Sequence, residues 1–147
     1  MNKKIIFSLL SIASLFFTIS CKTKVEPISS RIAKVWSASS VKENNVEVYK
    51  TGAITNTKPG YLNYKLDLST PPNVTIKEVD GGTYVGKYTV TDTKITITGL
   101  TPEPTGTSGS LSFTITSFTV TELILTADQD YAKTGGKRNI YTLITSK

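Results

Sequence analysis

Few residues in this 147-residue chain could do acid–base, nucleophilic or metal chemistry. It contains no histidine, one cysteine (Cys21) and eleven aspartate and glutamate residues. Histidine is the usual general base near neutral pH and a member of the common hydrolase triads. Its absence therefore argues against general base catalysis by histidine and against a hydrolase triad. Zinc sites are mostly built from cysteine and histidine. We therefore expect a protein that is not an enzyme and that holds no metal ion or other cofactor.

Carboxylate chemistry is what the composition leaves open. The run Asp128-Gln129-Asp130 resembles a fragment of a calcium loop, but it lacks the glycine and the distal glutamate of an EF-hand, so a solvated turn is favoured. A pair of carboxylates of the glycoside hydrolase kind is compatible with the sequence. Most acidic residues fall in expected turns or on polar strand faces, which makes an enzyme the least favoured of the functions considered.

Cys21 ends a segment that has the features of a secretion signal. Lys3 and Lys4 precede an apolar run over residues 5–19, which is shorter than the roughly 20 apolar residues of a membrane-spanning helix. The small residue before Cys21 resembles the bacterial lipobox, in which the cysteine is acylated and the chain is cut before it. Thr18 stands where leucine is usual in that motif. The alternative is an ordinary signal peptide that ends in a cysteine by chance.

Lipidation of Cys21 divides the chain into three parts. Residues 1–20 are the expected signal-peptide helix, residues 21–30 a short tether, and residues 31–147 a single folded domain. Each buried methylene of an acyl chain adds about 0.8 kcal/mol of membrane binding, so several chains make the attachment permanent in practice. Lys22 follows the cysteine, where an aspartate would suggest inner-membrane retention. We therefore expect an outer-membrane anchor, with the domain on the periplasmic or the surface side.

The charge pattern argues against a nucleic-acid partner. The net charge is +6, but the basic side chains are scattered along the chain and form no cluster that would grip phosphates. They include Lys34, Lys42, Lys50, Lys58, Lys65, Lys77, Lys87 and Lys94. Since Cys21 is the only cysteine, an anchored protein has none left for a disulfide, and packing alone must stabilise the domain.

Alternation of apolar and polar residues predicts short strands throughout the domain. The expected strands cover residues 35–41, 45–50, 61–68, 73–78, 82–90, 94–98, 110–118, 122–126 and 138–144. One helical turn is expected near residues 29–33, and no stretch keeps a helical apolar period for three turns. Asp80-Gly81-Gly82 suits a tight turn because these residues tolerate positive φ, and Pro71-Pro72 ends a strand because proline cannot donate ladder hydrogen bonds.

This spacing of strands predicts an all-β fold: an antiparallel, mostly up-and-down barrel of about eight strands. Neighbouring strands joined by hairpins are the simplest connection, because no helix of crossover length is available. An immunoglobulin-type sandwich is the competing architecture, although its usual Cys–Trp–Cys pattern is absent.

The order of the motifs along the chain is also informative. A short turn and a tryptophan strand (Ile32 to Ser37) come first, followed by an acidic-Gly turn with a Gly-x-aromatic strand (Val79 to Val90) and a Thr/Ile hairpin strand (Asp92 to Ile97). Residues 113–126 and a terminal strand complete the pattern. This order resembles the lipocalin-like domains of small lipoproteins from Gram-negative bacteria. The resemblance covers about residues 31–146 and implies a closed or nearly closed barrel. Val35 precedes the opening tryptophan, where a glycine is often found, and true lipocalins carry Gly-x-Trp in their opening strand.

Trp36, Tyr64, Tyr84 and Tyr88 are the candidate residues for lining a cavity. An eight-stranded barrel is either filled by its side chains or holds one small ligand, so these aromatic residues line a cavity or form the core. We expect a membrane-anchored lipoprotein that binds a small apolar or amphipathic ligand in the cell envelope. The alternative is a non-enzymatic interaction lipoprotein whose long loops contact an envelope protein or a glycan. The oligomeric state is left open.

Overall fold

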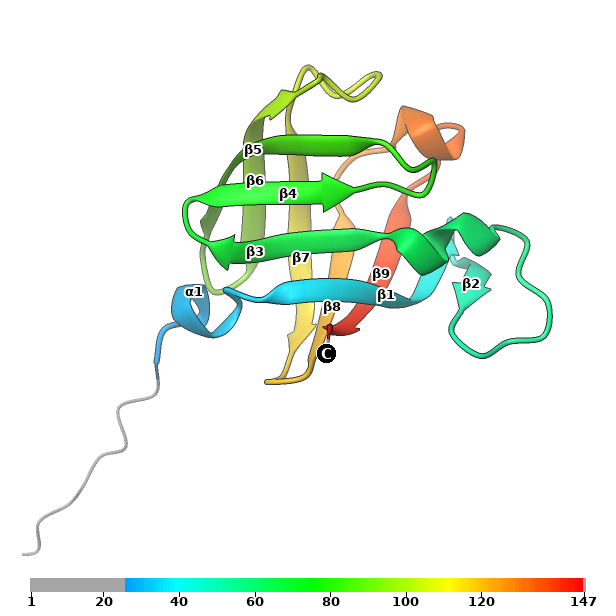
Figure 1. Ribbon diagram of the computed structural model, residues 1–147, viewed down its shortest axis with the longest axis horizontal. Helices are drawn as coiled ribbons and strands as arrows, with labels where there is room; N and C mark the ends of the chain where they lie inside the picture. The colour runs from blue at the N-terminus through cyan, green and yellow to red at the C-terminus, as the bar shows by residue number, and fades with distance from the viewer. Residues whose placement is uncertain (1–25, 147) are drawn as a thin grey trace, which may run out of the picture.

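The computed structural model describes residues 26–146, which form an almost entirely β-structured domain (Figure 1). Its elements are α1 (Ile28–Arg31), β1 (Val35–Glu43), β2 (Val46–Lys50), η1 (Pro59–Asn63), β3 (Lys65–Thr70), β4 (Asn73–Lys77), β5 (Thr83–Val90), β6 (Lys94–Thr101), β7 (Leu111–Phe118), β8 (Glu122–Ala127), η2 (Ala132–Thr134) and β9 (Asn139–Thr145), where η denotes a 3-10 helix. Over this part of the chain, no helix has the length and apolar character needed to cross a membrane. The expected signal-peptide helix and Cys21 lie outside the described residues.

The strands form one antiparallel sheet that closes on itself. Strands β3 to β9 pair in sequence order, and β1 completes the ring by pairing with β3 on one edge and with β9 on the other. The β1–β9 register runs from Trp36 opposite Thr145 to Glu43 opposite Asn139. The described domain is therefore a closed eight-stranded, up-and-down barrel. This confirms the predicted architecture and excludes the immunoglobulin-type sandwich.

Strand β2 is a ninth strand outside the ring. It pairs only with the second half of β1, from Ser40 opposite Lys50 to Glu43 opposite Val46, while the first half of β1 pairs with β3. Asn44 and Asn45 connect the two strands with φ values of 47° and 67°. Asparagine tolerates this left-handed conformation, and two such residues in succession give the hairpin turn that matches strand twist.

The start of β3 differs from the sequence prediction. Residues 61–63 belong to η1 and not to a strand, and Leu62 is 69% exposed, whereas Tyr64, Leu66 and Leu68 face the core as expected. The cause is local: Pro59 has the fixed φ that suits the first turn of a helix. A Cβ atom on Gly60 would lie 2.4 Å from the carbonyl oxygen of Val79, so glycine lets η1 pack directly on the turn that follows β4.

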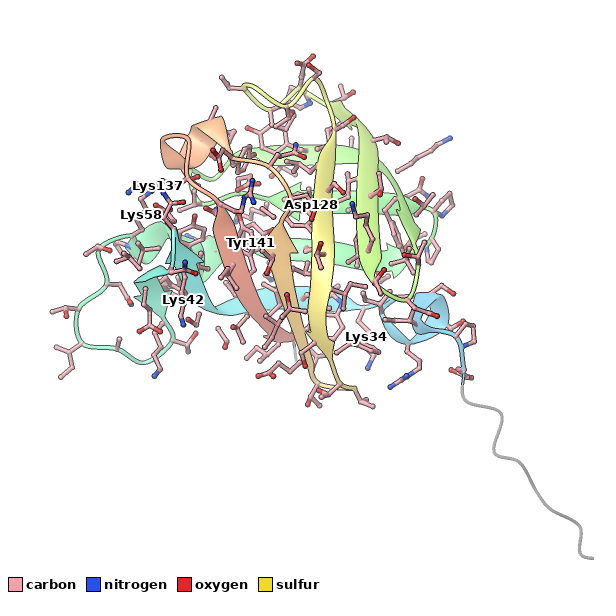
Figure 2. All side chains as sticks on the ribbon, turned by 180° about the vertical axis from the view of Figure 1, so that it is seen from behind. Lys34, Lys42, Lys58, Asp128, Lys137 and Tyr141 are labelled. Carbon is pink, nitrogen blue, oxygen red and sulfur yellow. The ribbon has the colours of Figure 1, made fainter. Side chains whose placement is uncertain are left out.

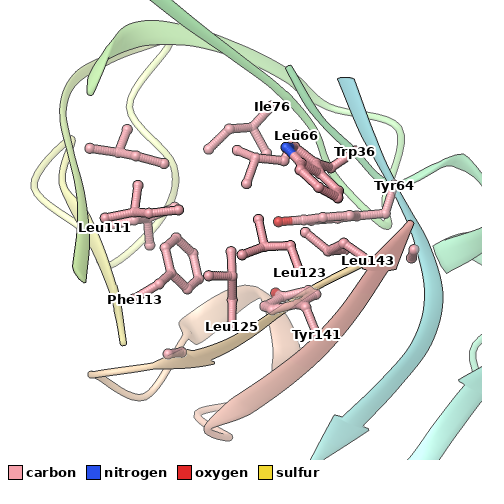
Figure 3. Packing of buried hydrophobic residues seen from close by; sticks show 14 of the residues in the cluster. Trp36, Tyr64, Leu66, Ile76, Leu111, Phe113, Leu123, Leu125, Tyr141 and Leu143 are labelled. Carbon is pink, nitrogen blue, oxygen red and sulfur yellow. The ribbon is translucent and has the colours of Figure 1, made fainter. Parts of the chain in front are cut away.

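Aliphatic and aromatic side chains make up most of the buried interior of the barrel (Figure 3). The buried leucine and isoleucine side chains each contribute about 1.5–3 kcal/mol by leaving water. At the end near α1, Trp36 is fully buried, donates from Nε1 to the Ile32 carbonyl at 2.8 Å and packs edge-on against Phe118. The opposite end, where η1 and η2 lie, is polar and is described next (Figure 1).

Candidate functional site at the carboxylate end of the barrel

Several inward-facing rows of apolar residues end in a buried polar residue at the end of the barrel away from α1. Glu43 continues the inward row of Val41 in β1, and Glu78 continues the row of Val74 and Ile76 just after β4. Asn139 begins β9 beside Glu43. Glu43, Glu78 and Asn139 are 1%, 2% and 0% exposed. We call this region, together with the buried tyrosines around it, the carboxylate end.

Glu43 is fully engaged by partners from the protein. Lys58 Nζ lies 2.7 Å from both carboxylate oxygens, and Lys137 Nζ lies 3.8 Å from Oε2. The Tyr61 hydroxyl donates to Oε1 at 2.9 Å. Figure 2 shows Lys58 and Lys137 side by side at this edge of the molecule. An ion pair of this kind offsets the cost of burying a carboxylate only when its remaining lone pairs are also satisfied, as they are here.

A hydrogen-bond chain leads from Glu43 across the interior. Asn139 Nδ2 donates to the hydroxyl oxygens of Tyr61 and Tyr141, at 3.2 and 2.7 Å. The ring of Tyr141 stacks on that of Tyr64, with centroids 4.8 Å apart and an interplanar angle of 19°. Burial raises the pKa of Tyr61, Tyr64 and Tyr141 well above its ordinary value of 10, so all three remain neutral hydroxyl groups.

Glu78 receives much weaker support than Glu43. Its Oε1 accepts a hydrogen bond from the Tyr131 hydroxyl at 3.1 Å. Burial raises the pKa of the Glu78 carboxyl from 4.5 to about 7, against the lowering effect of the Tyr131 hydrogen bond. Burial is the main cause of the raised pKa of Tyr131, and the Glu78 carboxylate raises that pKa further. Glu78 thus exchanges its proton near neutral pH, where an ordinary glutamate is fully ionised.

Two buried polar atoms at this end have no hydrogen-bond partner among the described residues: Glu78 Oε2 and Asn139 Oδ1. Buried polar groups are almost always paired, and leaving one unpaired costs about 1–3 kcal/mol. Both atoms are acceptors when Glu78 is ionised. The carboxylate end therefore has unused capacity to accept hydrogen bonds from a bound molecule.

The rim of this end carries a separate ion pair. Lys133 of η2 pairs with Asp80 in the turn after β4, and its ammonium group lies 4.8 Å from the centroid of the Tyr84 ring. The Lys133 hydrogen bond lowers the pKa of Asp80. In the turn itself, Asp80 Oδ1 accepts from the Gly82 amide at 3.0 Å and Gly81 has φ of 85°, so the predicted turn forms.

The structure separates the four predicted cavity residues into two groups, all of them buried. Tyr64 and Tyr84 belong to the carboxylate end. Trp36 lies at the opposite end, and the Tyr88 hydroxyl donates to the Leu68 carbonyl at 2.8 Å. Their role as cavity lining stays a prediction.

Sequence analysis did not single out Glu43, Glu78, Tyr61, Tyr131, Asn139 or Tyr141. A usable signal was present for the strand residues, because alternation places Glu43 in phase with Val41 and Glu78 in phase with Ile76. Tyr61 and Tyr131 had no such signal, since they belong to η1 and to the loop before η2.

Two further features bear on the chemistry of the molecule. A groove of about 490 Å³ lies over β4, β5 and β6 and is lined mainly by threonine, valine and glycine. None of the predicted site residues lines it, and neither of the two unpaired buried atoms belongs to it. Among residues 26–146, no three acidic side chains come together as metal ligands would.

A solved structure shares this architecture. A lipocalin-like protein from Bacteroides uniformis ATCC 8492 superposes with a TM-score of 0.52 at 15% identity, covering 79% of this chain and 99% of that one. An uncharacterized protein from Bacteroides eggerthii DSM 20697 gives a TM-score of 0.49 at 14% identity, covering 78% and 98%. No family model and no curated protein matches the sequence. The fold is thus lipocalin-like, as the motif order indicated.

Proposed function

We propose that this chain is a membrane-anchored binding protein that holds a small amphipathic ligand inside its lipocalin-like barrel, with the polar part of the ligand at the carboxylate end. The observation that carries this proposal is the pair of buried acceptors, Glu78 Oε2 and Asn139 Oδ1, which have no hydrogen-bond partner within residues 26–146. They lie at the end of an otherwise apolar interior, so a ligand with one polar and one apolar part matches the lining. The protein acts by binding and not by catalysis.

Native mass spectrometry of the mature protein, purified from its own host in mild detergent, tests the binding function. We expect an added mass of a few hundred daltons or less that is lost on denaturation. Glu78→Gln, which removes the charge but keeps the side-chain size, should lose that mass. A matched Glu122→Gln change at the opposite end of the barrel should keep it. Protein that carries nothing but ordered water would overturn the proposal.

The anchor is the second part of the proposal. Cleavage before Cys21 with acylation of its thiol would tether the domain to the outer membrane through a short segment. Mass analysis of the mature N-terminus tests this, and a Cys21→Ser variant should move from the membrane fraction to the soluble fraction. An intact N-terminus with an unmodified Cys21 would contradict lipidation.

A contact function has one specific observation in its favour. Ile54, in the loop between β2 and η1, is fully exposed, and Val46 and Leu62 of the neighbouring elements are also largely exposed. Exposed apolar side chains mark a protein contact when they form one continuous patch, so this function requires Ile54, Val46 and Leu62 to act as a single surface. Crosslinking in intact cells from position 54, compared with the exposed position 92 in the β5–β6 turn, separates this function from ligand binding. A specific adduct from position 54 alone would support it.

A further inference from the structure

The two buried carboxylates at the carboxylate end form a natural comparison. Each accepts a hydrogen bond from a tyrosine hydroxyl, Tyr61 for Glu43 and Tyr131 for Glu78. Glu43 additionally receives an ammonium group, because Lys58 Nζ bridges both of its oxygens. Glu78 has no such partner, and its Oε2 makes no hydrogen bond among the described residues. What distinguishes the two sites is the missing ammonium group.

The lysines near Glu78 are committed to other acids. Lys133 pairs with Asp80 at the rim, and Lys137 lies within ion-pair distance of Glu43. In the part of the chain that the structure describes, no ion pair reaches Glu78. The charge of Lys133 lowers the pKa of Glu78, which burial raises, but Lys133 forms its ion pair with Asp80, so a direct counter-ion for Glu78 must come from outside this set of side chains or be replaced by a proton.

Asn139 supplies a second acceptor whose identity is fixed by the hydrogen-bond chain. The Tyr61 hydroxyl uses its proton on Glu43, so it can only accept from Asn139. The group that faces Tyr61 is then the NH2 group of the amide, and the oxygen Oδ1 faces elsewhere without a partner. A ligand at this end meets acceptors, which selects a donor-rich group.

The surrounding rings favour a cation over a neutral donor. Tyr61, Tyr64 and Tyr141 surround this end of the interior, and the charge of Glu78 adds to burial in raising the pKa of each hydroxyl. Aromatic faces attract ammonium groups by about 0.5–2 kcal/mol, depending on how well water is excluded. The rim shows the same preference, where Lys133 sits over Tyr84.

We infer that the ligand carries a protonated amine, and that its ammonium group binds Glu78 at the carboxylate end, with Asn139 Oδ1 as the second acceptor available there. This inference rests on the proposed function, because it names the chemistry of that ligand. An alkylammonium group offers three N–H donors and one positive charge, which supplies to Glu78 what Lys58 supplies to Glu43.

Isosteric probes test the inference. Cyclohexylamine and cyclohexanol have the same ring and differ in the charged group, and their affinities for the mature detergent-solubilised protein can be compared by titration calorimetry. We expect the amine to bind at least about tenfold more tightly, since hydrogen bonds to charged groups contribute roughly 1.5–3 kcal/mol. Glu78→Gln should abolish this preference by lowering amine affinity to about that of cyclohexanol, and Glu122→Gln should preserve it.

The outcomes are distinguishable. Equal binding of both probes, or an amine preference that survives Glu78→Gln, overturns the ammonium inference while the binding function stands. Binding of neither probe, in a protein whose circular dichroism is that of folded β structure, overturns both the inference and the interior site.

A pH series on the unaltered protein gives a second readout that does not depend on a variant folding. Amine affinity should fall about tenfold or more between pH 8 and pH 5.5, because protons then compete for Glu78, while cyclohexanol affinity stays constant. The pKa of Glu78 is about 7, and those of the tyrosines around it are raised above 10. The pKa of Asp80 is lowered and that of Lys133 is raised, so neither titrates in this range. A flat amine profile would contradict the inference.

Discussion

At the scale of single residues, Lys58 has a larger effect than its position at the surface suggests. Its side chain is about one-third exposed, yet its ammonium group contacts both oxygens of a glutamate side chain that has no exposed surface. Removing one partner of a buried ion pair costs about 3–5 kcal/mol, and the exposure of Lys58 and the nearby Lys137 reduce this to about 2. We expect Lys58→Met to lower the free energy of unfolding by that amount in urea titrations.

The surface pair Lys94–Asp128 provides the matched control. Its two side chains are 2.9 Å apart, but Lys94 is about half exposed. Lys94→Met should cost less than about 1 kcal/mol, as exposed ion pairs usually do. Equal losses in the two variants would show that Glu43 is screened by water and that the Lys58 contact is not structural.

Glu78 should make the barrel less stable as the pH rises. Its folded pKa of about 7 lies above its ordinary value of 4.5, so the folded state binds the proton more tightly than the unfolded state does. Stability from this group is complete below pH 4.5, is lost as the pH rises towards 7, and stays lost above it. The predicted loss is about 3 kcal/mol at most.

Glu78→Gln should remove that dependence. Urea unfolding at pH 5 and pH 8, followed by circular dichroism, should show a smaller difference for Glu78→Gln than for the unaltered protein and for Glu122→Gln. The same pH difference in all three proteins would mean that water reaches Glu78 and keeps its pKa ordinary.

The sequence supports part of this site. Alternation along β1 and β4 puts Glu43 and Glu78 on inward faces, so their burial follows from strand geometry. Their neighbours do not follow from it: Tyr61 approaches Glu43 across 18 residues, and Tyr131 approaches Glu78 across 53. Such contacts depend on how η1 and η2 fold back over the barrel. The alternation of apolar and polar residues along a strand does not predict that arrangement.

At the scale of elements, η1 shows how one glycine positions the site. Any side chain at residue 60 would meet the Val79 carbonyl, which belongs to the turn directly after Glu78. Gly60→Ala should therefore push η1 away from that turn and cost about 1–3 kcal/mol, as overpacking does. Near-UV circular dichroism should also change, because Tyr61 moves with η1.

Gly52→Asn separates this steric effect from a general glycine effect. Gly52 has φ of 77°, but a Cβ atom there meets no atom within 4 Å. Asparagine tolerates that conformation, so the expected loss is only a few tenths of a kcal/mol. A loss for Gly60→Ala no larger than that for Gly52→Asn would contradict the close approach of η1.

The same element shows where strand prediction stops. Periodicity identified all nine strands, although β2 does not alternate strictly, since its adjacent residues Val48 and Tyr49 are both buried. It placed the start of the third strand too early, since Leu62 is apolar and falls in phase with Leu66. Leu62 is exposed because it belongs to the 3-10 helix that begins at Pro59. The alternating pattern cannot show this, since Leu62 is apolar and fits the pattern of a buried strand residue.

At the scale of the whole molecule, closure of the barrel separates β2 from the other strands. Every strand of the ring has a partner on both sides, whereas β2 has only β1. Its free edge is covered by the following loop, where Asn56 Oδ1 accepts from the Lys50 amide at 2.8 Å and Asn56 Nδ2 donates to the Lys50 carbonyl at 3.2 Å. This side chain takes the place of a strand neighbour, so Asn56 protects an edge that could otherwise pair with another chain.

Asn56→Ala should therefore loosen β2 and leave the barrel intact. Hydrogen exchange followed by mass spectrometry should show faster exchange in residues 46–50, with β9 and the first half of β1 unchanged, because the ring strands open only when the barrel unfolds. Asn63→Ala, at an exposed position in η1, is the control and should leave β2 protected. If loss of Asn56 instead accelerated exchange in β9, the β2 edge would be part of the same cooperative unit as the ring, and closure alone would not define the stable core.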